Sequence, residues 1–169
     1  MTGVVLETNG DRNIEYIVMN RLERLYPHLT FVRMPQFSSV DLVAYDRQTR
    51  TAVGFFEIKS RKETATKVRQ YGGLLLKHRK IDEMRLLIST TRLPATVVFA
   101  FENGEGELYG CRIESLPNKA LQYTGRRDRN LATDEEPVAL LNWPEQAQPD
   151  LFPMDWLTKD DSYSWYSED

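Results

Sequence analysis

The first regular pattern along the chain is a helical one. Between residues 13 and 25, apolar residues recur at positions 14, 17, 18, 22 and 25, so that they share one face of an amphipathic helix. Pro27 follows shortly afterwards and cannot continue a helix. The pattern therefore predicts a first helix over residues 13–25, with one face available to pack against a sheet.

The next three segments are short and apolar, which is typical of strands. Residues 29–34 form the first run, residues 40–45 the second and residues 51–59 the third. The polar stretch 46–50 joins the last two runs, as a turn does in a β-hairpin. We therefore expect three consecutive strands, of which the second and third form a hairpin.

Helical spacing then returns before two further β-rich runs. Apolar residues at positions 81, 84, 87 and 88 predict a second helix that ends near Pro94. Residues 95–101 and 107–113 alternate or continue as apolar runs around the turn 102–106, which contains two glycines. The expected order of elements is therefore α-β-β-β-α-β-β.

The pattern does not decide the secondary structure of two segments. In residues 61–77, Gly72 and Gly73 interrupt any helix, whereas the leucines at 74–76 are compatible with a short buried strand. The apolar run 138–141 is long enough to add an edge strand to the sheet.

Composition indicates one globular domain followed by a tail. The chain has 169 residues and 41% hydrophobic content, which is enough to bury a core within the usual size of a single domain. We expect this domain to span residues 1–150. Residues 151–169 are acidic and aromatic with little aliphatic content, and we expect them to form a C-terminal tail.

The sequence predicts a cytoplasmic protein that does not enter a membrane. No apolar run approaches the length of about 18 residues that a membrane span requires. Residues 1–7 lack the basic and long apolar regions of a signal peptide.

Cysteine and histidine are too rare for several kinds of site. Cys111 is the only cysteine, so the chain has no intramolecular disulfide, and two histidines cannot complete a zinc site of the usual composition. Any metal must therefore be held mainly by carboxylates.

Charge is distributed unevenly, although the net charge is only −3. Residues 1–133 carry 21 basic against 15 acidic side chains, whereas residues 134–169 carry one lysine against ten acids. Within residues 59–92, ten basic side chains face three acidic ones. Such a stretch can neutralise the phosphates of a nucleic acid, although it is also compatible with an ordinary solvated helix face.

Three charged residues of the predicted hairpin suggest a catalytic site. Asp41 opens one strand, and Glu57 and Lys59 close the next. Because side chains alternate along a strand, Glu57 and Lys59 point to the same side, with Ile58 directed into the core. Two carboxylates suit a hard cation such as Mg²⁺, and a lysine can position or deprotonate a water. The alternative is that Asp41 caps a loop and the other two residues form a solvated strand face.

The arrangement D-x15-E-x-K across a hairpin resembles the PD-(D/E)XK nuclease superfamily, in particular its phage-type nucleases and Holliday junction resolvase-like members. The usual proline before the first acid is replaced by Val40. The resemblance implies a restriction-endonuclease-like α/β fold with an α-β-β-β-α-β core, in which a mixed central sheet is flanked by helices. It also implies a metal-dependent nuclease that hydrolyses phosphodiester bonds of DNA in replication, recombination or repair, as an endonuclease or an exonuclease.

The resemblance also assigns roles to individual residues. Asp41 and Glu57 would bind Mg²⁺, for which Mn²⁺ can substitute, together with the backbone carbonyl of Ile58. Lys59 would orient or activate the attacking water. Many members carry a further metal-linked acid on the first helix, and Glu15 is the candidate here, with Glu23 as a competing choice and a surface glutamate as the alternative.

Basic residues around this motif are the candidates for DNA binding. They are Arg61, Lys62, Lys67, Lys77, Arg79, Lys80, Arg126 and Arg127. Lys80 is expected to contact a phosphate, because it precedes the second helix, whose N-terminus favours anions. Arg126 and Arg127 either grip the DNA backbone or pair with the acids that follow them.

Two other functions fit the same residues. A structure-selective resolvase would require a symmetric homodimer, so that two sites can act on two strands. A catalytically silent DNA-binding or regulatory protein would keep the fold without the chemistry. The acidic tail can dock a protein partner, cover the basic groove or pack in a dimer.

Overall fold

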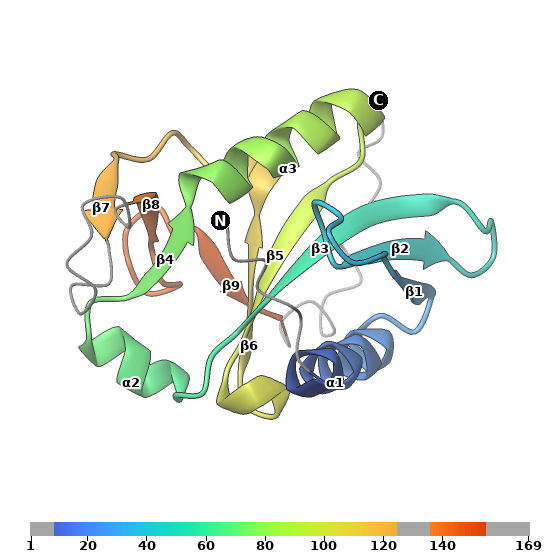
Figure 1. Cartoon of the computed structure of the whole chain (residues 1–169), viewed down its shortest axis with the longest axis horizontal. Helices are drawn as coiled ribbons and strands as arrows, with labels where there is room; N and C mark the ends of the chain where they lie inside the picture. Colours follow the sequence, from blue (N-terminus) through green and yellow to red (C-terminus); the bar gives the residue numbers. More distant parts are fainter. Residues whose placement is uncertain (1–8, 125–135, 155–169) are drawn as a thin grey trace, which may run out of the picture.

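The structure is a computed structural model that describes residues 9–124 and 136–154. Figure 1 shows a twisted sheet with helices on both faces and a smaller sheet beside it. In chain order the elements are α1 (Asn9–Leu25), β1 (Leu29–Arg33), β2 (Leu42–Asp46), β3 (Ala52–Ser60), α2 (Ala65–Gln70), β4 (Leu74–Lys77), α3 (His78–Thr91), β5 (Ala95–Ala100), η1 (Glu102–Gly104), β6 (Leu108–Arg112), η2 (Ile113–Ser115), β7 (Gln122–Thr124), β8 (Glu136–Leu141) and β9 (Leu151–Pro153).

The main sheet is mixed. It has six strands in the order β1-β2-β3-β5-β6-β9. Strands β3 and β5 are parallel, and the other neighbouring pairs are antiparallel. The parallel pair requires a long crossover, and α2, β4 and α3 supply it. The predicted hairpin of β2 and β3 is therefore confirmed, as is the mixed sheet flanked by helices.

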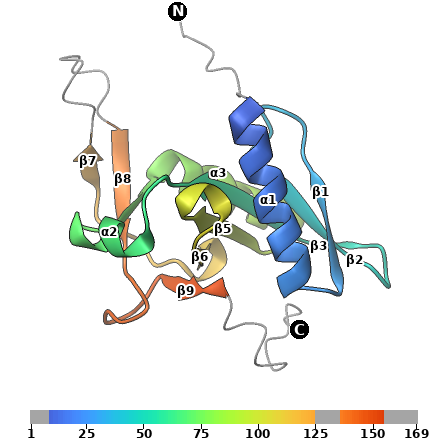
Figure 2. The same ribbon diagram turned by 90° about the horizontal axis from the view of Figure 1, so that it is seen from below.

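Each face of this sheet has its own apolar core. On one face, Val18 and Leu22 of α1 pack with Phe56 and Ile58 of β3. On the other face, Met84 of α3 packs with Phe55, Val97 and other residues of the sheet. Figure 1 shows α3 above β3 and β5 and α1 below them, and in Figure 2, which is seen from below, α1 lies in front. Alternate residues of β3 therefore face different helices, which places odd-numbered and even-numbered positions in separate environments near its end.

The open segment 61–77 contains both a helix and a strand. Thr64 accepts a hydrogen bond from the N–H of Lys67 and caps α2. Gly72 and Gly73 follow, both with φ of 107°, a conformation that glycine adopts at little cost. The chain then enters β4, as the leucine run suggested.

Strand β8 corrects the expectation of an edge strand at residues 138–141. It is the central strand of a second sheet with the order β4-β8-β7. The physical reason is that two separate segments pair with it, one from each side, and both are too short to reveal their pairing in the sequence. Ala139 and Leu141 are buried as a result.

Strand β9 corrects the expected boundary between domain and tail. Residues 151–153 pair with β6 at the edge of the main sheet, and Leu151 and Met154 are buried. These residues belong to the domain because their apolar side chains complete its core. The remaining residues of the expected tail, 155–169, lie outside the described residues.

No helix in the described part of the chain is long and apolar enough to cross a membrane.

Candidate active site

The backbone of β2 and β3 brings Asp41 beside the end of β3. The N–H of Asp41 donates to the carbonyl of Phe56 at 3.0 Å, and the next residue begins β2. The carboxylate oxygen Oδ2 accepts a hydrogen bond from the N–H of Ile58 at 2.7 Å. Asp41 is therefore held by two contacts to the strand that carries Glu57 and Lys59.

Glu57 and Lys59 lie on the same side of β3, as strand alternation predicts. The ammonium Nζ of Lys59 is 2.8 Å from Oε1 of Glu57. Glu57 is only 4% exposed, which is unusual for a carboxylate. Ile58 between them is buried in the core on the α1 side. The burial of Glu57 requires charged partners, because an isolated buried carboxylate is costly.

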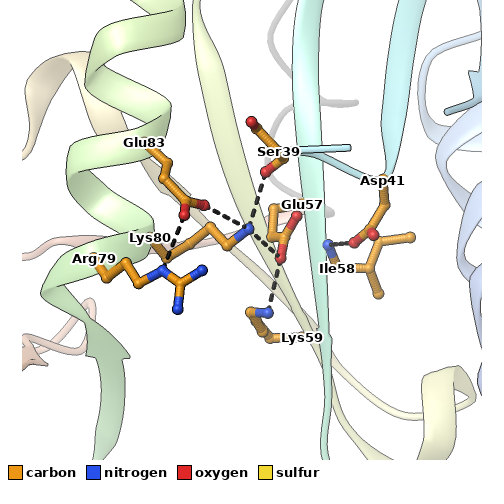
Figure 3. A network of polar contacts seen from close by, with 8 residues as sticks. All are labelled: Ser39, Asp41, Glu57, Ile58, Lys59, Arg79, Lys80 and Glu83. Atoms are coloured by element: carbon orange, nitrogen blue, oxygen red, sulfur yellow. Dashed lines mark hydrogen bonds and ion pairs between the residues drawn. The ribbon is translucent and has the colours of Figure 1, made fainter. Parts of the chain in front are cut away.

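A second lysine reaches the same carboxylate from α3. The ammonium of Lys80 lies 3.2 Å from Oε1 of Glu57, and it donates to the backbone carbonyl of Ser39 at 2.9 Å. Its side chain is 19% exposed and also lies 3.4 Å from Glu83. Figure 3 shows Lys80 and Lys59 on one side of Glu57 and Asp41 on the other.

Lys80 is the residue whose position the sequence did not predict. The phosphate contact expected of it stays a prediction, and the structure adds an ion pair with the buried Glu57 that the sequence did not indicate. The inward position of Lys80 depends on tertiary packing, because α3 follows β4 across the face of the main sheet. A basic cluster at residues 77–80 cannot reveal which of its members turns inward.

Burial and the charge of Glu57 both act on the Asp41 carboxyl group. The pKa of Asp41 is raised from its ordinary value of 3.8 to about 6, first by burial and then by the negative charge of Glu57. The hydrogen bond from Ile58 acts in the opposite direction. A nearby cation would therefore stabilise the ionised form of Asp41.

The donors at this point fit a divalent metal ion of the Mg²⁺ type. Asp41 and Glu57 offer carboxylate oxygens, and repulsion between their charges is what a dication would relieve. Among the described residues, no three His, Cys, Asp or Glu side chains come together as a metal cluster. Mg²⁺ commonly uses one or two carboxylates and completes its shell with waters and substrate phosphates.

Glu15 lies beside this pair without joining it in such a cluster. Its Oε2 accepts a hydrogen bond from Nε of Arg33 at 2.6 Å. Glu15 and Asp41 both line a small pocket of about 210 Å³, and the charge of Glu15 also raises the pKa of Asp41. Glu23, the competing acid, instead accepts from the N–H of Phe31.

A basic pocket of about 420 Å³ adjoins the carboxylate pair. Its lining combines both lysines of the site with further cations predicted to bind DNA. The basic residues in the lining are Lys59, Arg61, Lys77, Arg79 and Lys80, and the acid is Glu83. Lys62 and Lys67 do not line this pocket, and Arg126 and Arg127 lie outside the described residues. A larger cavity of about 880 Å³ is lined by other residues, including Arg21, Arg69 and Glu107, and contains none of the predicted site.

Comparison with known proteins identifies the family. A family model described as "Phage putative PDDEXK endonuclease" matches residues 2–145. The chain belongs to this family. Membership in these PD-(D/E)XK proteins confirms the superfamily predicted from the hairpin motif, and it identifies the protein as a nuclease.

The fold of this PD-(D/E)XK family member is similar to that of a solved structure. It is Hjc, a Holliday junction resolvase from the archaeal hyperthermophile Archaeoglobus fulgidus. The TM-score is 0.48 and the sequence identity is 16%, with 79% of this chain and 84% of that chain covered. No curated protein matches the sequence.

Proposed function

We propose that this nuclease is a Mg²⁺-dependent DNA endonuclease, with Mn²⁺ as a possible substitute. The observation that supports this proposal is that Asp41 and Glu57 flank Ile58 of β3, while Lys59, which contacts Glu57, lines a basic pocket. Carboxylates alone would suit a cation-binding site, and basic residues alone would suit an anion. Their juxtaposition suits a substrate phosphate that is held by the basic residues and by a cation on the carboxylates.

The basic pocket would hold the DNA backbone. Arg61, Lys77 and Arg79 line it beside the two lysines of the site. Arg79 has an 81% exposed side chain and Lys77 a 63% exposed one, so both can exchange their present glutamate partners for phosphates. The phosphate backbone would then pass directly beside Glu57.

The residues of the site divide the chemistry between them. Asp41, Glu57 and the carbonyl of Ile58 would hold Mg²⁺, which would supply Lewis-acid polarisation of the phosphate. Lys59 orients the attacking water through its ammonium. The water oxygen forms a new bond to phosphorus and releases one proton to solvent, the bond from phosphorus to the leaving oxygen breaks, and the leaving oxygen takes up a proton from solvent. Lys80 stabilises the negative charge that develops on the phosphate.

The test is cleavage of a panel of DNA substrates with and without Mg²⁺. The panel contains linear duplex, closed circular duplex, single strand, flap and four-way junction. Cutting of the closed circle identifies an endonuclease, because this substrate has no ends. Preferred cutting of the four-way junction by a protein that is dimeric in solution would favour a resolvase.

Variants connect the activity to the proposed residues. Asp41→Asn, Glu57→Gln and Lys59→Ala should each abolish cleavage while DNA binding is largely retained. Glu105→Gln is the control, since this exposed glutamate lies in the turn after η1, away from the pocket. Near-normal Mg²⁺-dependent turnover by Asp41→Asn or Lys59→Ala would contradict the proposal and leave a DNA-binding protein without this chemistry.

A further inference from the structure

Phe37 adopts an unusual backbone conformation beside the site. Its φ is 69°, in the left-handed region, and its side chain is 78% exposed. It is the only aromatic residue with positive φ in the described part of the chain. Arg50 and Arg92 share such φ values, but they lie in a hairpin turn and at a helix C-cap. A bulky residue in this conformation is strained, and the strain requires a reason.

The loop that carries Phe37 is fastened to the catalytic residues. Before it, the N–H of Met34 donates to the carbonyl of Asp41 at 2.8 Å. After it, the carbonyl of Ser39 accepts from the ammonium of Lys80. Within it, the N–H of Ser38 donates to the carbonyl of Pro35 at 3.1 Å. The aromatic ring therefore projects from a turn whose position is set by two members of the site.

Phe37 also shares a pocket with one of the proposed metal ligands. Phe37, Glu15 and Asp41 line the same pocket of about 210 Å³. A phosphate at the carboxylates would bring its neighbouring nucleotide close to this ring. In intact duplex the faces of that base are covered by stacked neighbours, so stacking of an aromatic ring first costs unstacking there and is most favourable where the base is already unpaired or displaced.

We propose that Phe37 stacks on an unpaired base next to the scissile phosphate. This inference rests on the proposed function and adds a substrate class to it: DNA with unpaired nucleotides at the cut. Aromatic stacking accepts any base, because every base presents a π face. The residue would therefore select DNA structure and not DNA sequence.

The test detects stacking with a fluorescent base that is built into the DNA. Two duplexes of equal length and sequence are compared, one fully paired and one with a two-nucleotide bulge that contains 2-aminopurine. Ca²⁺ replaces Mg²⁺ so that binding is measured without cleavage. Wild-type protein should quench the 2-aminopurine fluorescence when it binds. Phe37→Asn should lose this quenching and bind the bulged DNA about 5- to 100-fold more weakly, and Phe37→Trp should restore both.

The choice of variants separates stacking from a structural role. Asparagine tolerates the left-handed conformation better than phenylalanine, so Phe37→Asn should melt at or above the temperature of the wild type. Tyr71→Asn is the matched control, because Tyr71 is equally exposed at 78% but lies at the C-cap of α2. It should leave quenching and affinity unchanged.

Each other outcome has a definite meaning. Equal quenching by the wild type and Phe37→Asn would overturn the stacking role while the nuclease proposal stands. Reduced mass in solution for Phe37→Asn, without a change in quenching, would assign the ring to contact with a second copy and overturn it as well. A wild-type protein that neither binds nor cuts any DNA of the panel would refute the proposed function together with this inference.

Discussion

At the scale of single residues, the site places carboxyl groups where they are largely shielded from water. Glu57 is almost completely buried and is approached by two ammonium groups, whereas Asp41 has its pKa raised to about 6. The raised pKa of Asp41 means that its ionised form reduces the stability of the fold. Sites that bind cations commonly accept this cost, because the ligand compensates for it.

The first prediction concerns Asp41 and pH. Between about pH 4 and pH 6 the folded protein holds a proton that the unfolded chain has lost, so stability falls as pH rises through this window. At pH 8 the cost of the ionised group is roughly 3 kcal/mol at most. In EDTA, Asp41→Asn should therefore raise the free energy of unfolding by about 1–3 kcal/mol at pH 8.

The pH dependence provides the control for that prediction. The amide oxygen of asparagine can still accept the hydrogen bond from Ile58, so packing is little changed. Below pH 4 the aspartic acid is neutral as well, and the stability difference should disappear. Urea unfolding at several pH values measures it, and a difference that is independent of pH would show that the charge of Asp41 is not its cause.

The second prediction separates Lys80 from its basic neighbours. Lys80→Met should lower the single-turnover rate at saturating DNA by about 100-fold or more, because it removes a cation from the reacting phosphate. Lys77→Met should instead weaken binding and leave the saturated rate nearly unchanged, since Lys77 lies at the outer part of the pocket and pairs with Glu136. Similar effects of the two variants on rate and affinity would contradict the assignment.

At the scale of elements, the site depends on segments that are distant in sequence. β2 and β3 supply the acids, and α3 supplies Lys80 only because β4 carries the chain back across the sheet face. Strand β9 closes the other edge of the same sheet. Its three residues show how a short apolar segment, with little pattern of its own, becomes part of a core.

The third prediction tests the membership of β9 in the domain. Leu151 is 2% exposed, and Leu151→Ala should reduce the free energy of unfolding by about 2–5 kcal/mol, as cavities in a core do. Leu121→Ala removes the same atoms from a side chain that is 57% exposed, and it should cost well under half as much. Equal effects in thermal or chemical unfolding would place residue 151 outside the core.

At the scale of the whole molecule, charge is separated along the chain. Basic residues gather around the pocket between β3, β4 and α3, while residues 134–169 hold ten acids against one lysine. This distribution favours a polyanion at the pocket.

The fourth prediction concerns the salt dependence of DNA binding. Replacing Lys77 and Arg79 together by Ala should weaken affinity and reduce the slope of log affinity against log salt by about 1.8 on duplex DNA, or about 0.9 for each lost phosphate contact. Arg50→Asn with Arg92→Asn is the matched control. Both arginines are exposed, do not line the pocket and have positive φ that asparagine accepts. An unchanged slope in the first double variant would place the DNA elsewhere.

Local patterns determined much of this fold. Helical spacing located α1 and α3, and the apolar runs located β1, β2, β3, β5 and β6 within a few residues. The alternation of a strand was sufficient to place Glu57 and Lys59 on one side and Ile58 on the other. These features follow from short-range geometry, in which each side chain is positioned by its own backbone period.

Long-range pairing decided the rest. β8 is central because β4 and β7 reach it from both sides, β9 belongs to the main sheet because β6 offers it an edge, and Lys80 turns inward because a buried carboxylate stabilises its charge. Phe37, with its positive φ, likewise lies in a loop that Asp41 and Lys80 contact near its two ends. Such contacts join residues far apart in the chain, so their energies have no signature in any local window of sequence.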